Sequence, residues 1–148
     1  MSHKVKKFVG ARSTAAGTTS IDMTTWTPIA LATTTYDTVG NIHSPGTPTK
    51  LTAPFTGLYY VVGQNRWPDA TGGVHMRIGL RVDGTTFHAV MSKTANDTNN
   101  QYMNIGMPIY LTAGQYVELC GYHLSVTAIN AAHNTEAHLT LALLAVDH

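Results

Sequence analysis

The chain has 148 residues, the size of one compact domain, and no shift in composition divides it. Charged residues make up 11% of it, against about 25% in an average soluble domain, whereas the hydrophobic share of 43% is ordinary. Threonine is abundant and only two glutamates occur, so β-branched residues outnumber charged helix formers. This composition argues against a helical bundle, and the formal net charge of +1 argues against a nucleic-acid binder that depends on net charge.

The basic residues are unevenly placed along the chain. Lys4, Lys6, Lys7 and Arg12 lie in the first twelve positions, which contain no acidic residue, whereas the remainder carries eight acidic and five basic side chains. We expect residues 1–13 to form a basic arm, with Phe8 as its apolar contact, that attaches the domain at 14–148 to a larger particle. A solvated terminus is the alternative interpretation.

Two features bear on the cellular compartment. No run of about 18 apolar residues occurs, so no membrane-spanning segment is predicted, and no apolar region follows the basic residues as it would in a signal peptide. Cys120 is the single cysteine, which excludes an intramolecular disulfide, and its apolar surroundings at 116–122 predict a buried, inert thiol. These features favour synthesis in a reducing cytoplasm.

The first half of the chain alternates short apolar runs with loops. Residues 14–20 predict a loop, and a longer irregular stretch runs from Tyr36 to Pro48, where two prolines and a glycine within four positions exclude regular structure. Residues 58–62 form a continuous apolar run after Gly57, which predicts a strand buried on both faces. The strands predicted in this half are 8–11, 26–31, 50–52 and 58–62.

The second half of the chain shows clearer strand alternation. Residues 76–82 place apolar side chains at every second position, and Asp83-Gly84 then gives a hairpin signal. Residues 92–101 are polar and predict a loop, and Ala113-Gly114 predicts a turn. The strands predicted in this half are 76–82, 86–91, 105–111, 116–122 and 138–146, the last with Leu139, Leu141 and Leu143 on one face. No window has a helical period, so the pattern predicts an all-β sandwich or barrel.

The runs at 58–62 and 141–146 are apolar on both faces. If these two strands are neighbours in one sheet, the outer face of that sheet is a hydrophobic patch that needs a partner. Because aromatic residues are enriched at the centres of interfaces, we assign Tyr59, Tyr116 and Tyr122 to the same surface and infer an obligate oligomer. A central strand covered twice within one subunit is the alternative. The predicted interface residues are Leu58, Tyr59, Tyr60, Val61, Tyr116, Tyr122, Leu141, Leu143 and Leu144.

No catalytic or metal site emerges from the polar residues. The eight histidines are scattered, with no His-x-His pair and no HExxH motif, although an oligomer axis that gathers one histidine from each subunit stays open. Most aspartates fall in turns, and no Gly-x-Ser-x-Gly occurs. We therefore predict no enzyme and no cofactor, with a cupin-like enzyme as a disfavoured alternative. Loop residues that could meet a ligand are Trp67, Asp69, Asn96, Asp97 and Tyr102.

The order of segments over residues 26–146 resembles a known family. It runs through Thr27-Pro28-Ile29, Tyr36-Asp37 and His43 to 50–61 (KLTAPFTGLYYV), and then through Asp83-Gly84, 108–119 (PIYLTAGQYVEL) and 137–144. In this order the chain is similar to the globular heads of the complement C1q and tumour-necrosis-factor superfamily, although Gln115 stands where those heads carry aspartate. The resemblance implies a ten-stranded, two-sheet antiparallel jelly-roll sandwich that assembles as a homotrimer. It would also place 58–62 and 141–146 in one inner sheet that faces the three-fold axis.

No collagen-like Gly-x-y stalk precedes this head, and the threonine- and alanine-rich sequence resembles the stalkless jelly-roll modules of tailed-bacteriophage virions. The resemblance implies a non-enzymatic structural protein made in the host cytoplasm and located in the virion, most readily a capsid decoration protein bound to the major capsid protein or another virion protein. The alternative is a receptor- or glycan-binding adhesin module of a tail fibre or tail tip that contacts a host-surface glycan. Neither a membrane nor a specific nucleic acid is expected as a partner.

Overall fold

A computed structural model describes residues 7–68, 70, 72–96, 100–132 and 134–147. Over these residues the chain forms β-strands and one short 3-10 turn, η1 (Asn134–Glu136). The strands are β1 (Gly10–Thr14), β2 (Thr19–Ile21), β3 (Thr27–Pro28), β4 (Thr33–Asp37), β5 (Leu51–Thr52), β6 (Gly57–Trp67), β7 (His75–Val82), β8 (Thr86–Thr94), β9 (Gln101–Leu111), β10 (Tyr116–His123), β11 (Ile129–Ala131) and β12 (His138–Val146).

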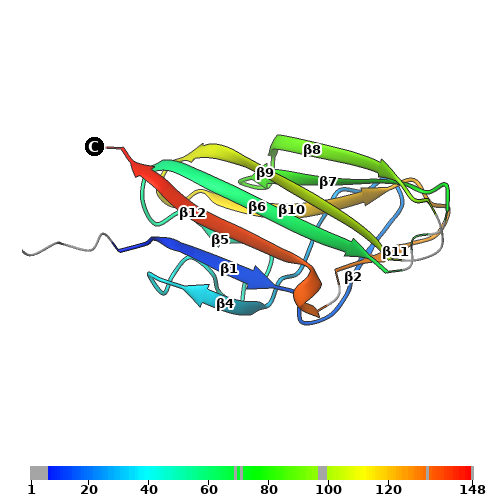
Figure 1. Cartoon of the computed structure of the whole chain (residues 1–148), viewed down its shortest axis with the longest axis horizontal. Coiled ribbons are helices and arrows are strands. Elements are labelled where there is room, and N and C mark those ends of the chain that lie inside the picture. The colour runs from blue at the N-terminus through cyan, green and yellow to red at the C-terminus, as the bar shows by residue number, and fades with distance from the viewer. Residues whose placement is uncertain (1–6, 69, 71, 97–99, 133, 148) are drawn as a thin grey trace, which may run out of the picture.

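The strands form two facing antiparallel sheets (Figure 1). The β6 sheet has the order β4-β1-β12-β6-β9, and the β7 sheet has the order β3-β10-β7-β8 with β5 paired to β10. A small two-stranded sheet joins β2 to β11. Most neighbours in each sheet are distant in sequence, as a jelly-roll sandwich requires, so the predicted all-β antiparallel jelly roll is confirmed. The sheet order also confirms that 58–62 and 141–146 are neighbours in one sheet.

The core lies between the two sheets and is built from strand alternation. The β7 side chains Met76, Ile78 and Leu80 are fully buried, as are Leu139 and Leu141 of β12, so the inward faces predicted for both strands are confirmed. The β6 strand alternates as well, because its inward residues are buried while Leu58 and Tyr60 are exposed. The prediction that 58–62 is buried on both faces is therefore wrong for the described part of a single subunit, in which no residue covers Leu58 or Tyr60.

The hairpin between β7 and β8 follows its sequence signal. Asp83 and Gly84 have φ values of 51° and 70°, and Thr85 N donates to Val82 O at 3.1 Å. Two consecutive residues with positive φ define a type I′ turn, whose twist matches that of the flanking strands. The Asp-Gly dipeptide therefore sets the register of β7 against β8.

Asp37 closes the loop that follows β4. Its carboxylate accepts backbone hydrogen bonds from Val39 (3.1 Å), Gly40 (2.7 Å), Ile42 (2.7 Å) and His43 (2.9 Å). Although partial burial alone would raise the pKa of Asp37, these four N–H donors lower it below its ordinary value. The Asp37 carboxylate thus accepts the backbone hydrogen bonds that regular strand pairing, which the prolines of the loop prevent, would otherwise satisfy.

Three strands were missed by the sequence prediction. The strand β4 is rich in threonine and almost wholly exposed, so it has no apolar alternation, and it forms by pairing with β1. The strands β2 and β11 have three residues each and pair only with one another. In addition, β8 extends to Thr94 and β9 begins at Gln101, so the predicted loops at 14–20 and 92–101 are both shorter than expected.

The predicted boundary between an arm and a domain at residue 13 is wrong. Residues 10–13 belong to β1, which is hydrogen-bonded between β12 and β4 in the β6 sheet. Any separate attachment segment therefore ends before Gly10. The chain enters β1 and leaves β12 at the same end of the sandwich (Figure 1).

Candidate functional site

The outer face of the β6 sheet carries an exposed apolar surface, here called the apolar face. The pairing of β6 with its neighbours places Leu58 beside Tyr110, and Tyr60 between Pro108 and Ala142. Tyr60 is 42% exposed and Tyr110 is 52% exposed, values that are high for large side chains in mid-strand. The apolar face consists of Leu58, Tyr60, Val62, Pro108, Tyr110, Ala142, Leu144 and Ala145.

A β-bulge near the end of β12 enlarges the apolar face. The register with β6 shifts between Leu143 and Ala145, so Leu144 has no opposite partner. After this shift, three consecutive residues, 144–146, are exposed, and Leu144 is 57% exposed. The bulge thus turns the end of an ordinary alternating strand into a continuous apolar ridge.

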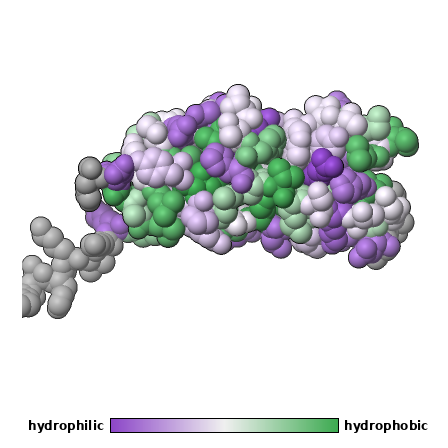
Figure 2. Space-filling model, turned by 90° about the horizontal axis from the view of Figure 1, so that it is seen from above, coloured by the Kyte–Doolittle hydropathy of each residue, from purple (hydrophilic) through white to green (hydrophobic). Residues whose placement is uncertain are grey.

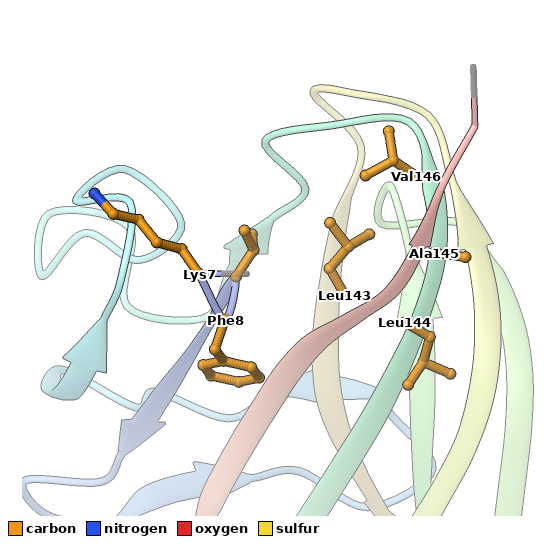
Figure 3. Close-up of a pocket in the computed structure, with 7 residues that line it drawn as sticks. Lys7, Phe8, Leu143, Leu144, Ala145 and Val146 are labelled. Atoms are coloured by element: carbon orange, nitrogen blue, oxygen red, sulfur yellow. The ribbon is translucent and has the colours of Figure 1, made fainter. Parts of the chain in front are cut away.

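A hollow lies beside this ridge (Figure 3). It has a volume of ≈ 760 Å³ and is lined by Lys7, Phe8, Val9 and residues 143–146. Phe8 is 52% exposed, and its ring centroid lies 6.1 Å from that of Tyr36. Figure 3 shows Phe8 on the segment before β1 and the leucines on β12, so the two ends of the described chain form the hollow together.

The other half of the outer face of the β6 sheet is polar. Arg66 forms an ion pair with Glu136 and donates to Asn100 Oδ1 at 2.8 Å, and the Tyr102 hydroxyl donates to Glu136 Oε1 at 2.9 Å. In contrast, Arg12 Nε and His138 Nδ1 are buried, and neither has a hydrogen-bond partner among the described residues. Burial, followed by the positive charge of Arg12, lowers the pKa of His138 to about 4.

A second apolar surface lies where β8 and β9 close one side of the sandwich. Met91 on β8 is 36% exposed, while Ile105 and Met107 on β9 are half-buried. Figure 2 looks onto this side from above and shows apolar residues in its middle, bordered by hydrophilic ones. We call Met91, Ile105 and Met107 the β8–β9 edge.

The predicted interface residues divide among three environments. Leu58, Tyr60 and Leu144 are exposed on the apolar face, and Leu143 is half-buried beside it. Tyr59, Val61 and Leu141 are fully buried in the core of the subunit, whereas Tyr116 and Tyr122 lie on β10 in the other sheet. The prediction that Tyr59, Tyr116 and Tyr122 share one surface is therefore wrong, because alternation and sheet order separate them.

The sequence prediction also missed members of the apolar face. Pro108 and Tyr110 occupy the outward positions of β9, while the predicted alternation of 105–111 considered only the inward ones. The sequence did contain this information, because the outward positions are the ones that alternate with the inward positions in the same strand.

The predicted attachment and ligand residues are only partly brought together. Lys7 and Phe8 line the hollow, and Arg12 lies on β1, while Lys4 and Lys6 lie outside the described residues. Trp67 is fully buried, with its ring edge-on to His123 at 6.3 Å, so it presents no surface to a ligand. Asn96 and Tyr102 are exposed, and Asp69 and Asp97 lie outside the described residues.

The remaining candidates from the sequence are the single thiol and the possible metal ligands. Cys120 is fully buried, and burial raises the pKa of its thiol to about 12, so the prediction of a buried, inert thiol is confirmed. The described residues contain no group of three His, Cys, Asp or Glu side chains that could hold a metal ion. Nor does the described part of the chain contain a helix long and apolar enough to cross a membrane.

Comparison with solved structures shows which fold this is. The chain is similar to the Eiger tumour necrosis factor of S. frugiperda, with a TM-score of 0.69 and 14% identity over 97% of this chain and 96% of that one. It is similar to the globular domain of zebrafish complement 1qA (TM-score 0.68, 11% identity, 95% and 100% covered) and to murine APRIL (TM-score 0.69, 12% identity, 93% and 100% covered). The chain therefore has the C1q/TNF-like jelly-roll fold.

No protein-family model matches the sequence, and a search of curated proteins found no match either. The likeness is thus one of architecture, spread over nearly the whole chain at low identity. Such a likeness defines how the sheets are arranged but leaves function to be argued from the surfaces themselves.

Proposed function

We propose that the chain is a non-enzymatic structural protein that assembles as a homotrimer through the apolar face, and that it serves as a capsid decoration protein of a tailed-bacteriophage virion. The observation that carries the assembly proposal is the apolar face itself. A contiguous group of large exposed side chains on a regular sheet is the usual mark of a protein–protein interface.

We infer a ring rather than a two-fold dimer, with the apolar face of one copy packed on the β8–β9 edge of the next. The apolar face and the β8–β9 edge are different surfaces of one subunit, so a contact between them joins unlike patches of two copies. Contacts of this head-to-tail kind close into rings when the rotation allows it. A three-membered ring agrees with the homotrimer that the sequence resemblance implies.

Attachment to the particle is assigned to the N-terminal end. Lys7 and Phe8 are exposed beside the hollow, at the end of the sandwich where β1 begins and β12 ends. In a trimer, three such ends would lie around one axis and bind a capsid surface together. Several weak contacts combined in this way give strong attachment.

The assembly proposal is tested by the mass of the purified protein in sedimentation equilibrium. We expect three times the mass of one chain for the natural protein, and a monomer for Tyr60→Arg, because each interface would then bury an unpaired charge. Val126→Arg is the matched control, since Val126 is 91% exposed in a loop, and it should remain a trimer. A monomeric natural protein, or a trimeric Tyr60→Arg, would contradict the proposal.

The decoration proposal is tested by cosedimentation of the protein with capsids of the phage that carries its gene. Deleting residues 1–6 removes Lys4 and Lys6 but leaves β1 complete, so the variant should remain a trimer and lose capsid binding. Replacing Phe8 with Ala should weaken binding as well. Capsid binding that survives both changes would contradict attachment through this end.

A further inference from the structure

The outer face of the β7 sheet carries aromatic rings interleaved with basic side chains. Tyr116 and Tyr122 point outward from β10 because Val117 and Leu119 point into the core. The ring centroid of Trp26 lies 4.5 Å from that of Phe87 and 5.1 Å from that of Tyr122. We call this surface the aromatic–basic row; its members are Trp26, Lys50, Arg77, Arg81, Phe87, Tyr116 and Tyr122.

Each basic side chain of the row lies over a ring. Lys50 Nζ is 4.1 Å from the centroid of Tyr116, Arg77 Cζ is 5.3 Å from that of Tyr122, and Arg81 Cζ is 5.8 Å from that of Phe87. These distances are within the range of cation–π attraction, which holds a charged group against a ring without neutralising it.

The sheet beneath the row is adapted to hold rings close. A Cβ atom added at Gly79 would lie 2.7 Å from the Phe87 ring, so Phe87 lies directly against the backbone of β7. On the adjacent strand Cys120 is fully buried. Trp26, Phe87 and Tyr122 are each half-buried, so they cover the sheet and still present part of their rings to solvent.

The basic residues of the row differ in whether an acidic side chain pairs with them. Arg81 is committed, because its Nε and Nη2 atoms donate to Glu118 Oε2 at 3.2 Å and 2.9 Å, and Glu118 is only 4% exposed. Arg77 donates through Nε to His75 Nε2 at 3.2 Å. Neither Arg77 nor Lys50 forms an ion pair with any described residue. If the row served only to cover the sheet, it would not require two cations that have no ion-pair partner among the described residues.

We propose that the aromatic–basic row binds an extended acidic polysaccharide, with sugar rings on the half-exposed faces of Trp26 and Tyr122 and sugar carboxylates on Lys50 and Arg77. Tyr116 and Tyr122 are six residues apart on β10, so their cations are separated by about 20 Å. A compact anion cannot reach both, whereas a linear chain with repeated carboxylates can.

Two further points favour this ligand and this face. Nucleic-acid binding draws its affinity from many phosphate contacts, and the row offers only two uncommitted cations. The row also lies on the face opposite the β6 sheet, so it stays accessible when the apolar face is covered. The proposal goes beyond the proposed assembly function, and a trimer that binds no sugar would overturn it without affecting that function.

The test is calorimetric titration at low salt with pentagalacturonate, with its fully methyl-esterified form as the neutral counterpart. We expect saturable binding of the acid form, binding of the ester about tenfold weaker, and a loss of about tenfold in each of Arg77→Gln and Lys50→Gln. Lys7→Gln removes the same charge from the opposite side of the molecule and should bind normally. Tryptophan fluorescence should respond to the sugar in the natural protein, and the response should vanish in Trp26→Phe, because Trp67 is fully buried.

The proposal is overturned if neither pentagalacturonate nor a hyaluronan oligosaccharide binds at millimolar concentration. It is also overturned if the ester binds as well as the acid, or if Arg77→Gln and Lys50→Gln leave the affinity unchanged. Tighter binding of an oligothymidylate would show instead that the row is a nucleic-acid surface. Sedimentation of every variant as a trimer shows that folding and assembly are intact.

Discussion

The two outer faces of the sandwich differ in how far side chains of the same subunit cover them. On the β7 sheet, the rings of Trp26 and Phe87 lie against one another, and outward residues such as Glu118 and Cys120 are nevertheless buried. Glu118 is bonded by Arg81 and Thr49 of the same subunit. On the β6 sheet no described residue covers Leu58, Tyr60 or Leu144, which remain exposed. Both sheets alternate in the same way, so the difference comes from what lies above them. Among the described residues, one face is covered by side chains of the subunit itself, and the other leaves large apolar side chains exposed.

An ion pair on each face shows the same contrast. The Arg81–Glu118 pair of the β7 sheet has side chains that are 16% and 5% exposed, whereas the Arg66–Glu136 pair of the β6 sheet has values of 15% and 41%. The two arginines are alike, so the carboxylates differ in how far they have been removed from water. Measuring the free energy of unfolding when each carboxylate is removed therefore tests whether the two faces differ in solvent access.

Glu118→Ala should have the largest effect. It would leave Arg81 desolvated without its carboxylate and would remove the acceptor of Thr49, so we expect a loss of about 3 kcal/mol in the free energy of unfolding. Urea denaturation followed by circular dichroism measures it. A loss below about 1 kcal/mol would mean that water reaches the pair and that the layer over the β7 sheet is open.

Lowering the pH should have the next largest effect on the free energy of unfolding, through the protonation of His138 on the β6 sheet. His138 has a pKa of about 4 in the folded chain against an ordinary 6.5, so its stabilising contribution is complete above pH 6.5 and is lost as the pH falls toward 4. We expect the loss to be on the order of 2 kcal/mol after allowance for solvent screening. Denaturation across this pH range should show a smaller acid loss in His138→Gln than in the natural protein.

Some acid sensitivity should remain in His138→Gln. Burial also lowers the pKa of His43, so this second histidine contributes in the same direction below pH 6.5. Asp37 contributes only in stronger acid, because its folded pKa lies below 3.8. An acid profile identical to that of the natural protein would contradict the assignment to His138.

Glu136→Ala should have the smallest effect. Its carboxylate is 41% exposed, so we expect the free energy of unfolding to fall by less than about 1 kcal/mol, even though Arg66 and Tyr102 both lose a partner. Denaturation of Glu136→Ala beside Glu118→Ala measures the difference. A loss equal to that of Glu118→Ala would show that a second copy buries this part of the β6 sheet.

Local sequence patterns were sufficient to predict the class of fold. The apolar alternation of 76–82 and 138–146 and the Asp83-Gly84 turn are local signals, and the structure confirms each of them. The resemblance of the segment order to the C1q and tumour-necrosis-factor heads implied that 58–62 and 141–146 lie in one sheet, and the pairing of β6 with β12 agrees with this. Where local signals were weak, as in the exposed threonines of β4, the strand exists only because β1 offers a paired edge, and no pattern could reveal it.

Which residues share a surface depends on the pairing of distant strands. Tyr59 and Tyr60 are adjacent in sequence, yet one is in the core and the other on the apolar face, because the register of β6 fixes which phase faces inward. Trp26, Phe87 and Tyr122 come from three distant segments and meet only because β10, β7 and β8 lie side by side. Composition and periodicity predict strands, but a surface is made by pairing between strands, which long-range contacts alone specify.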